Sequence, residues 1–380
     1  MKKKIIRIST VPMSLSGLLT GQLKYMTNYF EVVGISSKGG DKLQNVSDQE
    51  NIRTIPVELK RQISPINDLI TVWKLYKVLK KEKPFIVHSI TPKAGLLAMI
   101  ASKFAGVPHR LHTFTGLIFP TKHGFIKRLL ISTDKILCSC ATQIYPEGEG
   151  IKNDLINYKI TSKPLKIIAN GNVNGININH YNSNNFDENF ISNLKKEFSI
   201  SEKDYVFVFI GRLVKDKGIN ELISAFNELN SNLENTKLLL VGDYEHDLDP
   251  LKKKTLNIIK TNKNIISTGW VEDVRPYFKI SNLLVFPSYR EGFPNVVMQA
   301  GAMGLASIVT DINGANEIII PNKNGIIIPS MNKDKLKQAM LSFYNNEIII
   351  NSKTCRELIV NRYEQSILWK AQLNEYNSLK

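Results

Sequence analysis

The sequence predicts an α/β protein made of two doubly wound parallel sheets that face each other across a cleft. Three observations lead to this fold class. The chain has 380 residues, more than one ordinary hydrophobic core can organise. Short apolar runs alternate with amphipathic helical patterns, as parallel sheets require. The alternation stops at a stretch rich in Asn, Gly and Ser, residues 170–185, and then starts again.

These observations give the expected domain limits. We expect a first domain over residues 1–170, a hinge over 171–200 and a second domain over 201–362. The last helix, within residues 363–380, is long enough to pack back on the first domain.

In the first half, apolar runs predict the strands Ile5–Ile8, Val32–Ser36, Ile52–Val57, Phe85–His88, Arg110–Phe114, Ala141–Tyr145 and Lys166–Ala169. Helical patterns cover Leu18–Tyr29, Asp68–Lys81 and Lys93–Phe104. His88 at a strand end is a candidate ligand, although a structural histidine is the commoner case.

In the second half, the expected strands are Tyr205–Ile210, Lys237–Val241, Ile265–Ser267, Leu283–Phe286, Ala306–Thr310 and Gly325–Ile328. Helices are expected at Gly218–Asn230, Pro250–Thr261, Asp273–Ile280, from about Pro294, near Asn316, and at Lys333–Tyr344 and Tyr363–Tyr376.

The charge is unevenly placed along the chain. Residues 1–180 carry 26 Lys and Arg against 11 Asp and Glu, a net charge of +15, whereas residues 181–380 carry 24 against 23, a net charge of +1. A basic first half suggests an anionic partner, either a lipid surface or a nucleic acid. The alternative is a proteome that is rich in lysine throughout.

The three cysteines, Cys138, Cys140 and Cys355, form neither a disulfide framework nor a zinc pattern. The N-terminus lacks the apolar core of a signal peptide, and no window is apolar enough to span a bilayer. These features predict a cytoplasmic protein.

Two segments of the first half are candidate binding sites. Ser16 and Gly17, expected near a helix start, could hold a phosphate or simply cap the helix. Basic and apolar residues interleave at helical spacing over 122–131, which suits a membrane interface or an ordinary amphipathic helix packed on the sheet.

The clearest candidate site follows the strand Leu283–Phe286. Glu291 lies at the carboxyl end of that strand, and Gly292 lets the backbone approach a ligand closely. Pro294 suits an early helical position, so that neighbouring amides can donate to an anion. Gln299 lies eight residues after Glu291 and is expected to face the same crevice.

A second loop carries two cations after the strand Tyr205–Ile210. Gly211 permits a tight exit, while Arg212 and Lys217 suit a diphosphate. A carboxylate cannot favour phosphate, but Glu291 can accept hydrogen bonds from sugar hydroxyls. Together these residues describe a nucleotide-sugar site.

The whole chain resembles the retaining GT-B glycosyltransferases of glycosyltransferase family 4. The motifs that carry the resemblance are Gly211-Arg212-Leu213, Lys217-Gly218, Val241-Gly242-Asp243, Glu291-Gly292-Phe293-Pro294-Asn295 and Asn170-Gly171-Asn172-Val173. The resemblance implies two Rossmann-like domains, the donor in the C-terminal one, the acceptor in the N-terminal one, and no metal or other cofactor. It also implies that Arg212 and Lys217 bind the diphosphate and that Glu291 binds the transferred sugar.

The same resemblance places substrate near further residues. Backbone amides around Phe293, Pro294, Asn295 and Val296 would reach the sugar and the phosphate. Two positions depart from the family pattern. Gln299 replaces the usual Glu that holds the ribose, which puts ribose affinity in doubt. Thr115, before Gly116, replaces a His, so that no role of that His can be transferred.

For a retaining member, the resemblance implies front-face attack, in which the acceptor hydroxyl loses its proton toward the leaving diphosphate. The expected donor sugar is a hexose or N-acetylhexosamine, with uridine as the commonest nucleotide. The basic first half suits a lipid-diphosphate-linked acceptor at the inner leaflet, as in capsule or O-antigen assembly, with the protein bound peripherally there.

Two other functions compete with this one. A nucleotide-sugar epimerase of the same shape needs acid and base groups that the sequence does not reveal. A basic nucleic-acid-binding protein would leave Glu291 without a role, so no nucleic acid partner is expected. Asp247-Leu248-Asp249 imitates a metal-binding Asp-x-Asp motif, but its place before Pro250 favours a helix-capping loop.

Overall fold

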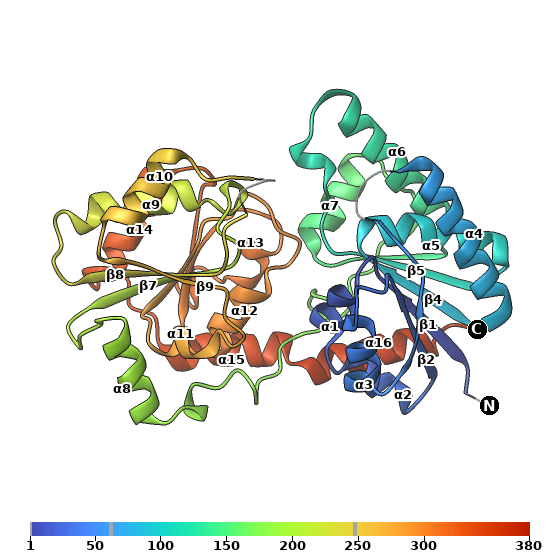
Figure 1. Cartoon of the computed structure of the whole chain (residues 1–380), viewed down its shortest axis with the longest axis horizontal. Helices are drawn as coiled ribbons and strands as arrows, with labels where there is room; N and C mark the ends of the chain where they lie inside the picture. The colour runs from blue at the N-terminus through green and yellow to red at the C-terminus, as the bar shows by residue number, and fades with distance from the viewer. Residues whose placement is uncertain (1, 61–63, 246–248) are drawn as a thin grey trace. The chain divides into compact units, whose positions relative to one another are not determined.

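The computed structural model describes residues 2–60, 64–245 and 249–380. Asp247 and Leu248 of the Asp-x-Asp motif therefore lie outside the described residues. The chain divides into two units, one of Met1–Gly175 with Gln365–Lys380 and one of Ile176–Glu364. Each unit contains one parallel six-stranded sheet with helices on both faces (Figure 1), so the predicted pair of α/β sheets is confirmed.

The first sheet has the strand order β3-β2-β1-β4-β5-β6. Its strands are β1 (Lys4–Ile8), β2 (Glu31–Ser36), β3 (Arg53–Pro56), β4 (Ile86–Ile90), β5 (His109–Phe114) and β6 (Gln143–Pro146). The unit's helices are α1 (Pro12–Leu19), α2 (Gln22–Thr27), α3 (Lys42–Glu50), α4 (Pro65–Glu82), α5 (Pro92–Ala105), α6 (Gly124–Cys140), α7 (Glu149–Asn157) and α16 (Gln365–Asn377).

Two apolar layers cover the faces of this sheet. One layer joins the sheet to α4, α5, α6 and α7, and the other joins it to α1, α2, α3 and α16. The central strands β1 and β4 are buried on both faces, which explains why they read as short apolar runs.

The second sheet has the order β12-β11-β10-β7-β8-β9. Its strands are β7 (Tyr205–Ile210), β8 (Thr236–Val241), β9 (Ile265–Gly269), β10 (Leu283–Phe286), β11 (Ala306–Thr310) and β12 (Gly325–Ile328). The unit's helices are α8 (Glu188–Glu197), α9 (Ile219–Asn230), α10 (Lys253–Thr261), α11 (Arg275–Lys279), α12 (Asn295–Ala302), α13 (Ala315–Ile318), α14 (Lys333–Tyr344) and α15 (Ser352–Tyr363).

Two expected elements of the first half differ in the structure. The single helix expected over Leu18–Tyr29 is two helices, because Gly21 adopts a positive φ of 76° between them. The carboxylate of Glu50 accepts hydrogen bonds from the Gly21 amide at 2.7 Å and the Lys24 amide at 3.0 Å, which caps α2. The strand expected over Lys166–Ala169 is absent from the described structure, which has only an isolated bridge between Leu165 and Ile144.

The segment expected as a hinge, residues 171–200, contains the helix α8. Its N-cap, Asp187, accepts hydrogen bonds from the amides of Asn189 and Phe190. Ile191 and Ile200 are buried in the core of the second unit, so this part of the segment is anchored there rather than extended as a linker.

The last helix also has its own boundary. Residues expected as one helix from Tyr363 divide at Glu364 into the end of α15 and the start of α16. α16 belongs to the first unit, where Tyr376 is buried. Among the described helices, none is both long enough and apolar enough to cross a bilayer.

Candidate active site

The second sheet reverses its strand order between β7 and β10. From β7 the chain adds β8 and β9 on one side, and it then crosses over to place β10 on the other side of β7. Loops that leave the carboxyl ends of two such strands diverge, and in open α/β sheets the opening between them is where ligands bind. The loop after β7 carries Arg212 and Lys217, and the loop after β10 carries Glu291.

The loop after β7 passes very close to the next strand. Gly211 has a φ of 146°, and its carbonyl oxygen lies 2.1 Å from where a Cβ on Gly242 would stand. Neither position tolerates a side chain without movement of the backbone. This close approach fixes the direction in which Arg212 leaves the sheet. The guanidinium of Arg212 forms an ion pair with Glu245 and is 62% exposed, so it can reach a ligand.

Lys217 and Glu291 form an ion pair, although they lie 74 residues apart. Their side chains are only 19% and 15% exposed. The ammonium of Lys217 also lies 5.3 Å from the centre of the Phe286 ring at the end of β10. The structure therefore brings the second cation and the carboxylate of the predicted site into direct contact.

The Glu291 loop is held by its neighbours. The Ser288 hydroxyl donates to Oε1 of Glu291 at 2.7 Å, and the Tyr289 amide donates to the Asp216 carbonyl at 2.8 Å. Asp216 belongs to the loop after β7, so the two loops are tied to each other. Both recorded partners of Glu291 among the described residues, Ser288 and Lys217, contact Oε1. Oε2 is the oxygen left to accept from a ligand.

The turn into α12 is also closely packed. Pro294 is the N-cap of α12, one residue before the position expected for it. Phe293 is buried, and its ring lies 5.5 Å from that of Tyr363 in an edge-to-face arrangement. A Cβ on Gly314 would lie 2.2 Å from the carbonyl oxygen of Gly292. The backbone from Gly292 to Asn295 is therefore held in place before any ligand binds.

Gln299 and Val296 lie in α12, and the side chain of Gln299 has a protein partner. Its Nε2 donates to the hydroxyl of Tyr181 at 2.7 Å. Burial raises the pKa of Tyr181 to about 12, so this hydroxyl stays protonated at neutral pH. Val296 is partly buried against the core. The structure thus places Gln299 beside Tyr181, a contact that the sequence did not suggest.

A cavity of about 500 Å³ opens at the carboxyl ends of β7, β8 and β9. Gly211 and Arg212 line it together with Tyr244, Trp270 and Val271. Trp270 is 70% exposed, and its amide donates to Asp243 at 3.0 Å. The aromatic rings were missed by sequence reasoning. The sequence could have indicated Trp270, because it follows the strand end Thr268-Gly269. The carboxyl ends of parallel strands meet at one edge of a sheet, so Trp270 could have been expected near Val241-Gly242-Asp243.

Asp249, the described end of the Asp-x-Asp motif, serves the same loop. Its Oδ2 accepts a hydrogen bond from the Asp216 amide at 2.6 Å. The carboxylate therefore caps the turn Lys215–Lys217, which ends in Gly218 at a φ of 71°. A Cβ on Gly218 would lie 2.1 Å from the Pro287 carbonyl oxygen, so a glycine is required where this turn passes β10.

In the first unit, Ser16 and Gly17 do not lie at a helix start. α1 begins at Pro12, whose fixed φ suits the first helical position, so residues 16 and 17 lie inside the helix. The Ser16 hydroxyl is directed to the Pro12 carbonyl at 3.4 Å. The expectation that these two residues lie near a helix start is therefore wrong, while phosphate binding by them stays a prediction.

The strand-order reversal of the first sheet lies between β1 and β4, and it is marked by two threonines. The Thr10 and Thr91 hydroxyls are 2.9 Å apart, and the Thr10 amide donates to the Thr91 hydroxyl at 3.3 Å. Thr91 has a φ of 70°, which is unusual for a branched residue. Sequence reasoning missed this pair, which is 81 residues apart.

His88 and the Thr115-Gly116 turn lie nearby. His88 is inside β4, not at its end, and contacts the Tyr376 hydroxyl at 2.6 Å and the Thr113 hydroxyl at 2.8 Å. Complete burial lowers its pKa well below the ordinary value, so the ring is neutral. It is a structural histidine. Thr115 and Gly116 follow β5, and Gly116 lines an apolar cavity of the first unit.

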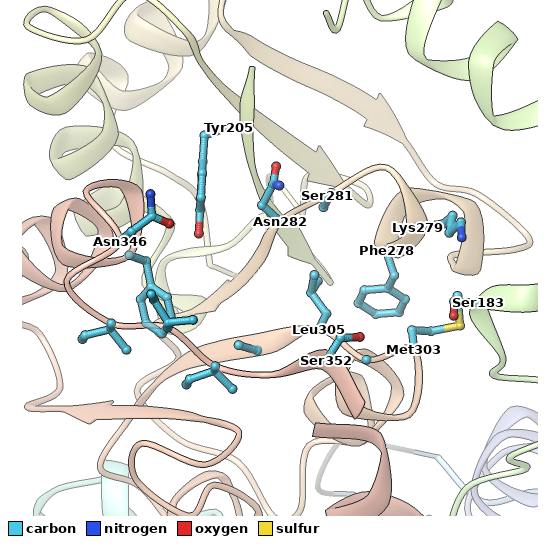
Figure 2. Close-up of a pocket in the computed structure, with 16 residues that line it drawn as sticks. Ser183, Tyr205, Phe278, Lys279, Ser281, Asn282, Met303, Leu305, Asn346 and Ser352 are labelled. Atoms are coloured by element: carbon cyan, nitrogen blue, oxygen red, sulfur yellow. The ribbon is translucent and has the colours of Figure 1, made fainter. Parts of the chain in front are cut away.

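A further cavity of about 410 Å³ lies in the second unit. Figure 2 shows Tyr205, Asn282 and Leu305 around it. These residues stand where β7, β10 and β11 begin, at the opposite edge of the sheet from Glu291. Because ligands of such sheets bind at the carboxyl ends of the strands, this cavity is not the predicted site.

The sequence matches the models of two families, one in each half of the chain. The family described as "Glycosyl transferases group 1" matches residues 190–365, and the family described as "Glycosyl transferase 4-like" matches residues 14–147. The capsular polysaccharide biosynthesis glycosyltransferase CapM of Staphylococcus aureus is 30% identical over 379 residues, which cover 99% of this chain and 97% of CapM. The UDP-Gal:alpha-D-GlcNAc-diphosphoundecaprenol alpha-1,3-galactosyltransferase of Escherichia coli is 28% identical over 374 residues, or 95% of this chain and 93% of that enzyme.

Solved glycosyltransferase structures share the fold. A glycosyltransferase from Rickettsia africae ESF-5 superposes with a TM-score of 0.81 at 19% identity, covering 100% of this chain and 98% of that one. Anabaena HepE in complex with UDP and glucose gives 0.81 at 16% identity, with 100% of both chains covered. The lipopolysaccharide outer core galactosyltransferase WaaB gives 0.72 at 18% identity and covers 99% of each chain. The predicted GT-B fold class is confirmed.

Proposed function

The chain belongs to the group 1 glycosyltransferases of glycosyltransferase family 4, a retaining family with the GT-B fold, and we propose a specific reaction for it. It transfers a hexose or an N-acetylhexosamine from a UDP-sugar, with retention, to a lipid-diphosphate-linked sugar during cell-surface glycan assembly. The names of the Staphylococcus and Escherichia relatives concern such glycans, and the Escherichia relative is named for a diphosphoundecaprenol acceptor.

The observation that carries the proposal is the contact between Lys217 and Glu291, which joins the loop after β7 to the loop after β10. Arg212 belongs to the same loop as Lys217. A diphosphate needs cations, and a sugar needs a hydroxyl acceptor within a few ångströms of them. In the structure, Glu291 neutralises Lys217 in a mostly buried place. A bound donor would share Lys217 through its phosphate while its sugar hydroxyls donate to Glu291.

The aromatic cavity beside Arg212 is the proposed place of the nucleotide base. A planar base can lie against Trp270 or Tyr244, because stacking on an aromatic ring is favourable for every base. Arg212 lines the same cavity and precedes Lys217 in the loop after β7, so in this proposal it would bind the diphosphate next to the base. Tyr181 orients Gln299, the proposed ribose contact, by the hydrogen bond that Nε2 donates.

The proposed reaction breaks the bond between the anomeric carbon and the β-phosphate oxygen while the acceptor hydroxyl attacks from the same face. The hydroxyl proton passes to the departing phosphate oxygen. Negative charge grows on the diphosphate, and Arg212, Lys217 and the amides at the start of α12 stabilise that charge. The backbone at Gly292–Asn295 is already fixed, so little reorganisation is needed.

The acceptor belongs to the first unit in this proposal. Thr10 after β1 and Thr91 after β4 offer hydroxyls at the strand-order reversal, where a sugar can be hydrogen-bonded. Thr115 and Gly116 follow β5, the strand next to β4. The excess of positive charge over residues 1–180 suits an anionic lipid surface. We place the protein peripherally at the inner face of the cell membrane.

The test is a thermal-shift panel of UDP-, GDP- and dTDP-sugars on the wild-type protein, followed by transfer assays with the donor that binds. UDP-sugars are expected to raise Tm, and Lys217→Ala is expected to abolish the shift. Arg290→Ala is the matched control, since Arg290 is a cation of the neighbouring loop after β10 that pairs with Asp216 at 3.1 Å. Epimerisation of the donor without acceptor would favour an epimerase instead.

A further inference from the structure

We propose that the first unit holds part of the hydrocarbon chain of a lipid phosphate in an apolar cavity beside α6. The inference rests on the proposed function, which supplies a lipid-linked acceptor, and it assigns a place to the chain of that lipid. The headgroup stays outside the cavity, among the cations of α6.

The cavity lies at the carboxyl edge of the first sheet. It is bounded by α4, by the start of α5, by the loop after β5 and by α6, and α4, α5 and α6 pack on the same face of that sheet (Figure 1). Its volume is about 170 Å³, the space of roughly six waters at ~30 Å³ each. The apolar side chains that line it are Leu96, Phe114, Leu117, Ile118, Leu129 and Leu130.

An apolar path leads from the surface into this cavity. Ile118 and Leu129 line the cavity and are themselves 38% and 37% exposed. One turn before Leu129 on α6, Phe125 and Ile126 are 79% and 55% exposed. Exposed apolar side chains next to an apolar cavity are costly in water. A bound hydrocarbon chain would remove its own surface and the surface of these side chains from water.

The charges around the path select an anionic amphiphile over a neutral one. Lys122, Lys127 and Arg128 flank the exposed residues Phe125 and Ile126 in the sequence. Among the described residues, the ion pairs pass from Lys93 to Lys152 without one of these three cations. The recorded partner of Lys127 is the Tyr158 side chain, with its ammonium 4.8 Å from the ring centre. Cations beside an apolar entrance match a chain that ends in phosphate.

The polar groups inside the cavity argue against a phosphate entering it. Asp134 and Asp68 both line the wall. Lys93 pairs with Asp68 at 2.6 Å, so that cation is already neutralised. A phosphate inside would meet two acidic side chains and a cation that is already paired, whereas a hydrocarbon chain meets mostly leucine. The chain therefore goes in and the headgroup stays with the cations outside.

The test uses farnesyl diphosphate as the probe and inorganic diphosphate as its headgroup control. The full-length protein is titrated by calorimetry below the micelle concentration of the probe, with saturating UDP so that the diphosphate loops of the second unit are occupied. Farnesyl diphosphate is expected to bind and inorganic diphosphate is not. Leu96→Phe, which fills the cavity from a partly buried position, is expected to weaken binding by about tenfold or more.

Three further variants separate the cavity from the surface. Leu130→Gln makes the cavity polar without adding bulk and is expected to weaken binding as well. Phe125→Ser removes apolar surface at the entrance, so it should lower sedimentation with phosphatidylglycerol vesicles and weaken farnesyl diphosphate binding less than the cavity variants do. Phe104→Ser, at a phenylalanine that is 73% exposed near the end of α5, is the matched surface control and should leave farnesyl diphosphate binding within about twofold. The Tm of each variant verifies that it folds.

The proposal is overturned if inorganic diphosphate binds as tightly as the farnesyl probe. It is also overturned if both cavity variants keep wild-type affinity, or if Phe125→Ser alone abolishes binding, since the lipid would then be held by the surface only. The UDP-induced Tm shift reports on the second unit independently. Loss of that shift in the wild type would overturn the proposed function, whereas an intact shift without farnesyl binding overturns the cavity alone.

Discussion

Both sheets place polar side chains at the strand-order reversal, but these side chains are charged in the second unit and neutral in the first. In the second unit, the loops at the strand-order reversal carry a lysine and a glutamate in contact. In the first unit, the corresponding loops carry two threonine hydroxyls 2.9 Å apart. The same architecture therefore presents charged groups in the second unit and neutral hydrogen-bonding groups in the first. We infer that the charged pair serves the diphosphate donor and the hydroxyls serve a sugar acceptor.

The net charge of each half of the chain does not predict the charge of the site residues within it. Residues 181–380 are nearly neutral, yet they contain Arg212 and Lys217. Residues 1–180 carry almost all the excess charge, yet Thr10 and Thr91 are uncharged. Net charge thus describes the surface of a domain, while a binding site depends on a few groups that the strand ends hold together.

The largest expected effect comes from breaking the charged pair. Glu291→Gln and Lys217→Ala should each lower kcat/KM by about a thousandfold, since each removes a group that stabilises charge or orients the sugar in the transition state. Steady-state transfer assays measure the loss. Arg290→Ala should change kcat/KM by less than about threefold. A similar loss in all three variants would show that the two loops as a whole, not the pair, matter.

The second effect distinguishes the units by their response to acid. Burial lowers the pKa of His112 to about 3 and that of His88 well below its ordinary value, so the unfolded first unit binds two more protons below pH ~6.5. Burial raises the pKa of Asp134 to about 7. Below that pH the folded unit binds one proton at Asp134 that the unfolded chain does not, which offsets one of the two histidine protons. As the pH falls from roughly 6 to 4.5, the free energy of unfolding of the first unit should therefore decrease by about 1.4 kcal/mol per pH unit.

Urea unfolding of a Trp270→Phe variant measures this loss, because the two remaining tryptophans, Trp73 and Trp369, both lie in the first unit. Asp134→Asn removes the opposing proton, so the loss should become steeper. A stability that stays constant from pH 6 to 4.5 would contradict the assignment of neutral buried histidines.

The third effect tests the hydroxyl pair. Thr91→Val removes one hydroxyl without changing the shape of the side chain, and it should lower kcat/KM for the acceptor by about tenfold while UDP binding stays unchanged. Thr91→Ser should keep most of the activity. Thr27→Val is the control, because the described partner of the lost hydroxyl is the Lys24 carbonyl of the same helix. Weaker UDP binding in Thr91→Val would argue against separate roles of the two units.

The smallest effect sharpens the role of Arg212. Glu245 neutralises part of its charge in the absence of ligand, so Glu245→Gln should strengthen UDP binding by about threefold, measured by calorimetry. Glu202→Gln breaks an exposed pair with Lys195 and should leave UDP binding unchanged. If Glu245→Gln weakens binding instead, the carboxylate serves to orient Arg212.

The strands were predictable because burial on both faces leaves a readable signal. Tyr205–Ile210 and Leu283–Phe286 have the limits in the structure that their apolar runs predicted. Short polar helices leave little signal, and α3 and α8, in which few residues are buried, were missed. The break at Gly21 was missed too, since it depends on Glu50, which is distant in sequence.

The site was predictable in part for the same reason. A strand end followed by glycine and charge located Arg212, Lys217 and Glu291, but their sequence spacing gave no indication that Lys217 and Glu291 form a pair. Tyr181, the partner of Gln299, lies 118 residues from it in a segment expected to be a hinge. Such partners follow from tertiary packing, which a local pattern does not contain.

The return of α16 to the first unit has a consequence for the order of folding. Arg7 donates to the hydroxyl of Tyr376 at 2.7 Å, a contact between residues 369 apart in the sequence. Closing so long a loop is slow, because its entropy cost comes before any contact is gained. The second unit is one continuous segment, Ile176–Glu364, so we expect it to fold before the first unit completes its packing.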